Sequence, residues 1–200
     1  MAKDNIFVDT KELDKLAIGL KGLEKQMPGA SASALNRTVD FIYTRIGRLV
    51  TQEYSIKITD VKKTIKKYKA KKGDLSAKLV SKGHTLSLAH FSFSPKKPGT
   101  RRQVKVKIKR GKSKPVGVDP KAFVASTGAK SADKVQYNVF KRTTNKRLPV
   151  VVLRTLSVPQ MIGNANVEAQ IQEAAQKKLG ERIEHEINWR LDKLKKQLKG

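Results

Sequence analysis

Few residues of this chain are of types that could do chemistry, and their spacing does not group them. His84 and His90 are six residues apart on a segment that alternates like a β-strand. That spacing would put about 20 Å between them along the strand, which argues against a shared metal ion. His185 lies between Glu184 and Glu186 in a helical pattern, without the second histidine one turn away that a zinc-binding helix needs. The chain contains no cysteine, so thiolate ligands and disulfide bonds are excluded.

A phosphate-binding loop is excluded as well. Gly111-Lys112-Ser113 matches the end of that motif, but the motif needs an earlier glycine where Val106 stands in a predicted strand. Carboxylates for acid–base or magnesium chemistry are scarce in the middle of the chain, with three among residues 61–160. We therefore interpret the chain as a non-enzyme that holds no metal and no cofactor.

Net charge is the strongest signal in the composition. The chain carries 44 lysine and arginine residues against 17 aspartate and glutamate residues, a net charge of +27. The excess is concentrated, because residues 61–115 contain 19 basic residues and one acidic residue, whereas residues 1–40 contain six of each. Such a density of one charge favours contact with a polyanion or with an acidic protein surface. The alternative is that these lysines form a solvated face.

The candidate contact residues fall into three groups. They come from a basic segment after the second predicted helix, from two basic loops with the strand between them, and from a basic turn near residue 145. The predicted partner or DNA contacts are Lys62, Lys63, Lys66, Lys67, Lys96, Lys97, Arg101, Arg102, Lys105, Lys107, Lys109, Arg110, Lys141, Arg142, Lys146 and Arg147.

The aromatic residues bear on how nucleic acid could be bound. Charge alone predicts phosphate contact and carries no base reading, whereas modules that stack bases need exposed aromatic side chains. Phe91 and Phe93 fall on an alternating apolar face and Tyr68 on a helical stripe, so we predict that all three are buried. No helix-turn-helix, zinc-finger or ribonucleoprotein motif is present. A basic protein that binds nucleic acid without sequence preference stays open as the alternative function.

The N-terminal third has helical periodicity. An amphipathic helix is predicted over residues 9–26, with Asp9 as its cap, and a second helix over about 30–54. The two are close enough in sequence to form an antiparallel hairpin. Thr59 offers a cap for a short basic helix over residues 60–69.

From residue 75 the apolar period changes from 3.6 to 2, which predicts strands. About six short strands, joined by sequential hairpins, predict an antiparallel sheet. Basic loops are expected at 94–103 and 110–118. The predicted strands cover residues 75–81, 85–93, 104–109, 122–126, 137–142 and 150–154.

Helical periodicity returns at the C-terminus, over residues 164–198, after Ser157-Val158-Pro159 ends the last strand. The chain is thus predicted to be a single α+β domain over residues 1–200. It would contain N-terminal helices at 9–72, a β-region at 75–155 and a long C-terminal amphipathic helix. No apolar run approaches about 18 residues and no signal-peptide pattern is present. We therefore expect neither a membrane span nor secretion.

Several short motifs, in this order, resemble the minor tail protein Z family of long-tailed phages and prophages. The resemblance extends over about residues 20–198 and is one of order and spacing. It is carried by Ala34-Leu35-Asn36-Arg37, the basic stretch DVKKTIKKYKAKKGDL at 60–75, Ala122-Phe123-Val124, Val139-Phe140-Lys141-Arg142, Arg147-Leu148-Pro149-Val150, Ser157-Val158-Pro159 and the C-terminal helix.

The resemblance implies a non-enzymatic virion protein that completes the tail at its head-proximal end and takes part in head–tail joining. It also implies a ring-shaped homo-oligomer around the DNA passage, for which six subunits are one candidate order. The expected partners are further copies of the chain, the neighbouring tail terminator, tube and neck proteins, and, through non-specific contact, the genomic DNA. The expected location is the tail or neck of the virion, with assembly in the host cytoplasm.

Overall fold

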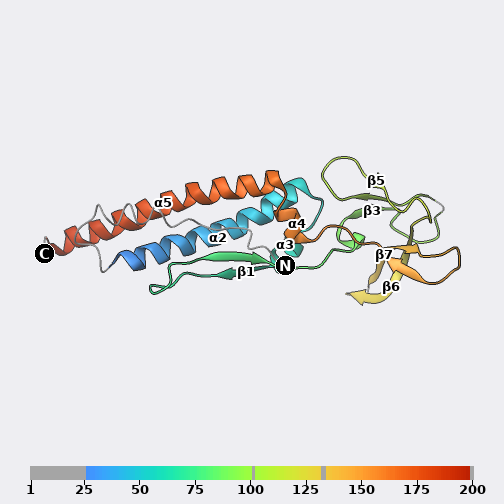
Figure 1. The fold of residues 1–200 in the computed structure, drawn as a ribbon, viewed down its shortest axis with the longest axis horizontal. Coiled ribbons are helices and arrows are strands. Elements are labelled where there is room, and N and C mark those ends of the chain that lie inside the picture. Colours follow the sequence, from blue (N-terminus) through green and yellow to red (C-terminus); the bar gives the residue numbers. More distant parts are fainter. Residues whose placement is uncertain (1–25, 101, 132–133, 199–200) are drawn as a thin grey trace. The chain divides into compact units, whose positions relative to one another are not determined.

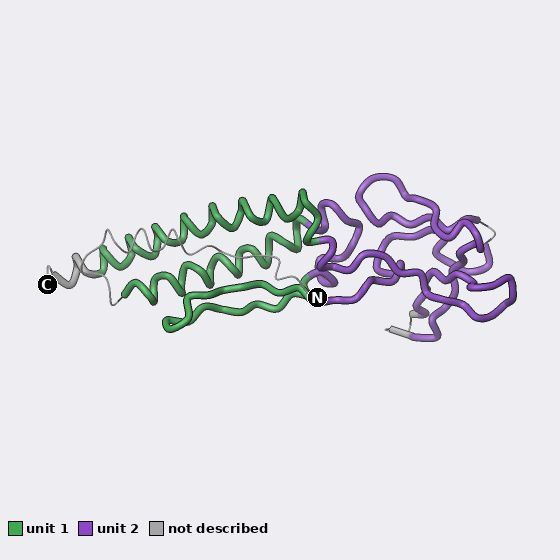
Figure 2. Tube along the Cα trace, in the orientation of Figure 1, with its two compact units in different colours: residues 1–49, 62–82, 162–200 green, residues 50–61, 83–161 purple. Residues whose placement is uncertain are grey.

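The structure, a computed structural model, describes residues 26–100, 102–131 and 134–198. Helices occur together with three small antiparallel sheets, which confirms the predicted α+β class. The chain divides into two compact units (Figure 2): unit 1 comprises residues 1–49, 62–82 and 162–200, and unit 2 comprises residues 50–61 and 83–161. A single domain over residues 1–200 stays a prediction. The helix predicted over 9–26 lies outside the described residues except for its last position, so the N-terminal hairpin stays a prediction too.

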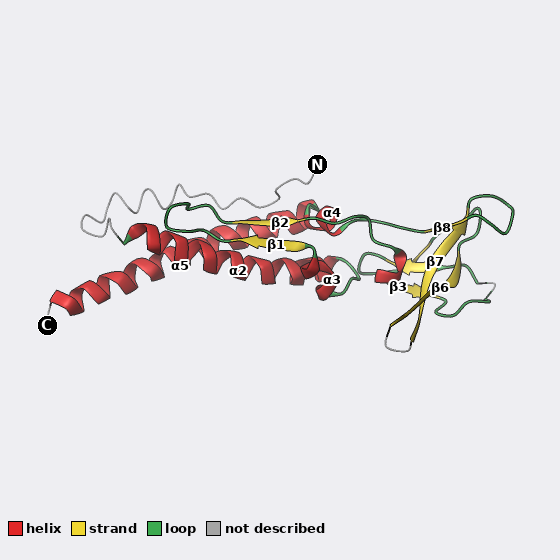
Figure 3. Cartoon of the chain, turned by 90° about the horizontal axis from the view of Figure 1, so that it is seen from below, coloured by secondary structure: helices red, strands yellow, loops and turns green. Residues whose placement is uncertain are grey.

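Unit 1 is built on two long helices, α2 (Met27–Glu53) and α5 (Ala165–Leu198), which lie side by side (Figures 1 and 3). α2 starts earlier than predicted, because Pro28 is tolerated in a first turn, where no backbone N–H is needed. Its apolar residues recur three or four positions apart and so return to one face. The predicted stripe is buried, and its members are Leu35, Val39, Ile42, Ile46, Leu49 and Val50.

α5 buries a stripe with a different period. The Asn164 side chain caps its start by accepting a hydrogen bond from the backbone N–H of Asn166 (3.2 Å), and the helix continues through Gly180 without a break. Buried residues recur every four positions, and because four residues turn a helix by about 400°, this stripe winds slowly around the helix axis. Its members are Val167, Ile171, Ala175, Leu179, Ile183 and Ile187.

The basic helix predicted over residues 60–69 is wrong beyond residue 63. α3 spans Ile58–Lys63, and the chain then forms β1 (Ile65–Tyr68), which pairs antiparallel with β2 (Lys78–Ser81). The apolar spacing fitted a helix, but the backbone hydrogen bonds to β2 are long-range and override that local preference. The predicted burial of Tyr68 is wrong as well, since this side chain is 47% exposed.

The first sheet of unit 2 consists of β3 (Ser92–Ser94), β4 (Lys105–Lys107) and β5 (Lys114–Pro115), all antiparallel. The strand predicted over 85–93 is interrupted by a 3-10 helix, η1 (Leu88–His90). Residues 86–88 hydrogen-bond to the backbone of residues 153–156 instead of continuing into β3. Phe91 and Phe93 are buried, as predicted.

The second sheet of unit 2 contains β6 (Phe123–Ser131), β7 (Lys134–Arg142) and β8 (Val150–Val152). The predicted strand–turn–strand is confirmed, because β7 and β8 pair antiparallel around the basic turn at 143–149. Val124 and Val139 face each other across the sheet and are both buried. The strands therefore belong to separate small sheets, since loops rich in glycine and proline separate the hairpins.

A short helix, α4 (Val158–Ile162), follows the last strand. The Ser157 hydroxyl accepts a hydrogen bond from the Gln160 backbone N–H (3.4 Å), and the Gln160 carboxamide oxygen accepts one from the Ser157 N–H (2.9 Å). This reciprocal pair is a capping box. Among the described residues, no helix combines the length and the apolar character that crossing a membrane requires.

The stripe on α2 makes a stability prediction. Ile42→Ala should lower the free energy of unfolding by about 2–5 kcal/mol, because it leaves a cavity in a packed core and Ile42 is 1% exposed. The matched control is Phe41→Ala at the next position, where the side chain is 39% exposed and the loss should be clearly smaller. Urea denaturation followed by circular dichroism measures both variants. Equal losses would contradict the assignment of the Ile42 face to the core.

Candidate partner-contact surfaces

The histidines do not form a site. His84 is exposed in a loop, and His185 is exposed on α5. His90 lies at the end of η1, where its Nδ1 is 3.1 Å from Oδ2 of Asp60. Within the ranges that the structure describes, no group of three or more potential metal ligands gathers.

The predicted contact lysines of unit 1 divide into two kinds. The Lys62 and Lys67 ammonium groups lie 5.5 and 4.8 Å from the centroid of the Tyr43 ring on α2, a distance at which cation–π attraction acts. Lys63 and Lys66 are exposed, and their side chains make no hydrogen bond or ion pair with the described residues. Only this second pair is fully available to a partner.

Asp40 on α2 explains why Lys67 is engaged. Its two carboxylate oxygens accept hydrogen bonds from Lys67 (2.6 Å) and Lys69 (3.0 Å). The hydrogen bond from Lys67, followed by that from Lys69, lowers the pKa of Asp40. The ionised carboxylate thus ties the β1 segment to α2. Asp40 is the only acidic residue between Glu24 and Glu53, and that isolation is the signal by which the sequence could have identified it.

Glu186 on α5 is a buried carboxylate that the sequence analysis missed. Ser33 donates a hydrogen bond to its Oε1 (2.8 Å), Arg190 donates one to its Oε2 (2.6 Å), and Arg37 Nε lies 3.5 Å from Oε1. Burial by itself raises the pKa of Glu186, but the hydrogen bonds from Arg190 and Ser33 outweigh it, so the pKa is lowered overall. Ser33 and Arg37 belong to α2, so this ionised group fixes the register of the two helices.

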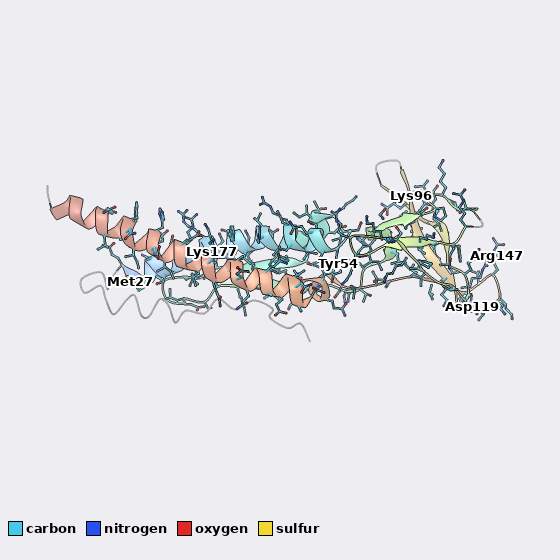
Figure 4. The ribbon with its side chains drawn as sticks, turned by 90° about the horizontal axis from the view of Figure 1, so that it is seen from above. Met27, Tyr54, Lys96, Asp119, Arg147 and Lys177 are labelled. Atoms are coloured by element: carbon cyan, nitrogen blue, oxygen red, sulfur yellow. The ribbon has the colours of Figure 1, made fainter. Side chains whose placement is uncertain are left out.

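A groove of about 490 Å³ lies on the exposed side of the same two helices. Lys178 spans it, with its ammonium group 5.3 Å from the Phe41 ring centroid and 2.7 Å from Oε2 of Glu181. The hydrogen bond from Lys178 lowers the pKa of Glu181, so this carboxylate also stays ionised. The neighbouring Lys177 is marked on α5 in Figure 4. The lining residues are Phe41, Arg45, Gln170, Glu173, Ala174, Lys177, Lys178 and Glu181.

In unit 2 the structure brings predicted contact residues together on the sheet of β3 and β4. Lys105 pairs with Ser94 and Lys107 with Ser92, so these four side chains share one face of the sheet. Between them, Phe93 and Val106 are buried on the other face. The sequence predicted the two lysines, whereas the two serines could not be identified without the register of the strands.

The loops beside this sheet hold further predicted residues. Lys97 and Arg102 are exposed without a side-chain partner among the described residues, and Arg101 lies outside them. Lys96 covers the Phe93 ring, with 4.6 Å from its ammonium group to the centroid. Lys109 forms an ion pair with Glu53 (3.4 Å). Arg110 donates a hydrogen bond from its Nε to the Thr51 carbonyl oxygen (3.1 Å), so the last three have structural roles.

The turn at 143–149 carries the last predicted group. It is closed by Thr143, whose N–H and hydroxyl both donate to the Pro149 carbonyl oxygen (3.3 Å each). Arg142 stacks over Phe123, 5.2 Å from the ring centroid. Lys146 and Arg147 are exposed in this turn, where Figure 4 marks Arg147, so these two are the members of the group most available to a partner.

Comparison with known proteins adds one finding. The model of a protein family described as prophage minor tail protein Z (GPZ) matches residues 10–197. The match therefore extends through all the described elements of both units except the last residue of α5. Neither the curated proteins nor the solved structures contain a match.

The Glu186 cluster makes a prediction about pH. Glu186→Gln should lower the free energy of unfolding at pH 7 by roughly 1.5–3 kcal/mol, the usual contribution of hydrogen bonds to a charged group. Because the folded-state pKa of Glu186 is lowered, its contribution is present above about pH 4.5 and is lost as the pH falls through that lower pKa. The difference between the two proteins should therefore shrink as the pH falls below about 4.5.

Urea titrations at several pH values measure this effect. The matched control is Glu184→Gln, which removes an exposed carboxylate two positions away on the same helix and should change stability by at most about 0.5 kcal/mol. A difference between Glu186→Gln and the unaltered protein that does not depend on pH would contradict an ionised Glu186 in the folded state.

Proposed function

The chain belongs to the prophage minor tail protein Z family and is therefore a structural component of a phage tail; we propose that it acts in tail completion at the head-proximal end. The observation that carries this proposal is the family match over residues 10–197, which leaves few residues outside it. In this proposal the protein sits in the tail or neck of the virion, is assembled there from the host cytoplasm, and takes part in joining heads to tails.

We propose further that copies of the chain form a ring around the DNA passage. A ring multiplies the net charge of +27 per chain, and like charges at short range oppose assembly unless partners or counterions neutralise them. In such a ring, the cationic surfaces would therefore face acidic neighbouring proteins or nucleic acid. The packed helices of unit 1 would supply rigid subunit bodies, and the loops of unit 2 would supply the contacts.

The neighbouring partners in this proposal are the tail terminator, tube and neck proteins. The surfaces that support such contacts are those predicted contact residues that are exposed and have no structural role, because their charge is not used within the described fold. The tip of the turn at 143–149 is one of these surfaces. A soluble protein that only binds nucleic acid is the competing function, and it predicts tight, salt-sensitive binding without any place in the virion.

Electron microscopy of virions tests the location. Antibody or gold labelling of this protein should give signal at the head-proximal end of the tail, and a phage that lacks it should accumulate heads and tails that do not join. Native mass spectrometry of the purified protein, alone and with tails, measures the ring order. Absence of the protein from mature virions would overturn the proposal.

Charge reversal at the turn tests the contact surface. Lys146→Glu with Arg147→Glu should reduce infectivity by about tenfold or more, because two repulsive contacts at an interface cost several kcal/mol. The matched control is Lys71→Glu with Lys72→Glu, an equal change of charge at exposed positions of unit 1. Circular dichroism should show that both proteins remain folded. Unchanged infectivity would show that the turn is only a solvated loop.

A further inference from the structure

The stretch from β3 to β5 carries basic residues and no acidic ones. Residues 92–116 contain ten basic residues and no acidic residue. Unit 2 as a whole has 19 basic and four acidic residues, whereas unit 1 has 25 and 13. The carboxylates that could balance this stretch from within unit 2 are therefore very few.

The described fold neutralises little of that charge. Within the described part of residues 92–116, the ion pair of Lys109 with Glu53 is the one contact to a carboxylate. Six side chains make no hydrogen bond, ion pair or ring contact with any described residue. They are Lys97, Arg102, Lys105, Lys107, Lys112 and Lys114.

Three of these lysines lie on strands, and two of them share both a strand and a face. Lys105 and Lys107 stand two residues apart on β4, which spaces them by about 7 Å. Ser94 and Ser92 lie directly opposite, at about 5 Å across the strands. The buried side chains of Phe93 and Val106 lie on the opposite face of these strands. We call Ser92, Ser94, Lys105 and Lys107 the β3–β4 face.

We propose that the β3–β4 face binds successive phosphates of double-stranded DNA without reading its bases. Each lysine with its facing serine offers an ammonium group and a hydroxyl, which are the usual donors to phosphate oxygens. The repeat along β4 presents two such donor pairs in a row to a regularly charged backbone. This inference deepens the proposed function, on which it rests for the source of the DNA.

The residue types favour nucleic acid over an acidic protein. Five of the six cations without partners are lysines, and lysine acts as a point charge that tolerates many phosphate positions along a regular polyanion, whereas arginine gives the bidentate geometry that recognises one carboxylate or phosphate specifically. No exposed aromatic side chain is available to stack on bases within the described part of unit 2, which favours a duplex over a single strand at this face. Among the described residues of unit 2, the large apolar side chains that are exposed are Val118, Val135, Leu148 and Val151, none of them aromatic.

The test is equilibrium binding of the purified full chain to a duplex of mixed sequence, by fluorescence anisotropy at several salt concentrations. Lys105→Gln with Lys107→Gln should reduce the slope of log affinity against log salt by about 2. Between 50 and 200 mM salt the double variant should then lose roughly tenfold less affinity than the unaltered protein. Ser92→Ala with Ser94→Ala should weaken binding without changing the slope, because a hydroxyl releases no counterion.

The matched control, Lys71→Gln with Lys72→Gln, removes the same charge from unit 1 and should leave the slope within about 0.5 of the original. Urea denaturation establishes that each variant folds. An unchanged slope in Lys105→Gln with Lys107→Gln overturns the inference. It is also overturned if single-stranded DNA binds more tightly than duplex, or if polyglutamate binds more tightly than DNA through the same two lysines.

The two proposals can fail separately. If DNA binding depends on the β3–β4 face but the protein is absent from virions, the inference stands and the tail-completion proposal fails. If DNA binding does not depend on this face while the protein still labels the head-proximal end of the tail, the inference fails and tail completion stands.

Discussion

The packing of α2 against α5 is the interaction on which unit 1 depends. The apolar stripe of α2 keeps one face of the helix, whereas the four-residue stripe of α5 winds around its axis, so apolar contact alone would allow the helices to slide. Glu186 removes that freedom. A buried carboxylate is tolerated only where its oxygens are hydrogen-bonded, and Ser33 and Arg190 meet that condition from two different helices. One register of α2 and α5 satisfies it.

The scarcity of acidic residues determines which basic residues are held within the fold and which stay available to partners. Asp40 and Glu186 in unit 1, and Glu53 in unit 2, each hold a basic residue that would otherwise be free. Because so few carboxylates are available, the cations without a structural role outnumber them. The fold thereby leaves an excess of positive charge at its surface. Such a surface attracts negatively charged partners outside the chain, and this attraction weakens as the ionic strength rises.

The elements that sequence reasoning predicted well are those whose signal is local and repeated. The stripe of α2 recurs from Leu35 to Val50, and the hairpin of β7 and β8 is marked by β-branched runs on either side of a polar turn. Residues 64–69 were misassigned because lysine favours helices, while the determinant of β1 is its pairing with residues 78–81. The serines of the β3–β4 face, and Ser33 and Arg37 beside Glu186, depend on contacts between distant segments, which no local pattern encodes.

The position of Lys105 and Lys107 also changes which part of the basic region is suited to binding. The sequence predicted contacts on the loops at 94–103 and 110–118 and on the strand between them, on charge alone, but ordering a long side chain on a loop costs conformational entropy on binding. β4 removes much of that cost, because its backbone is paired on both sides, with β3 and with β5. The buried Val106 fixes the face on which the two lysines project. Of the three sources of positive charge, the two loops and β4 between them, the strand is therefore the preorganised one.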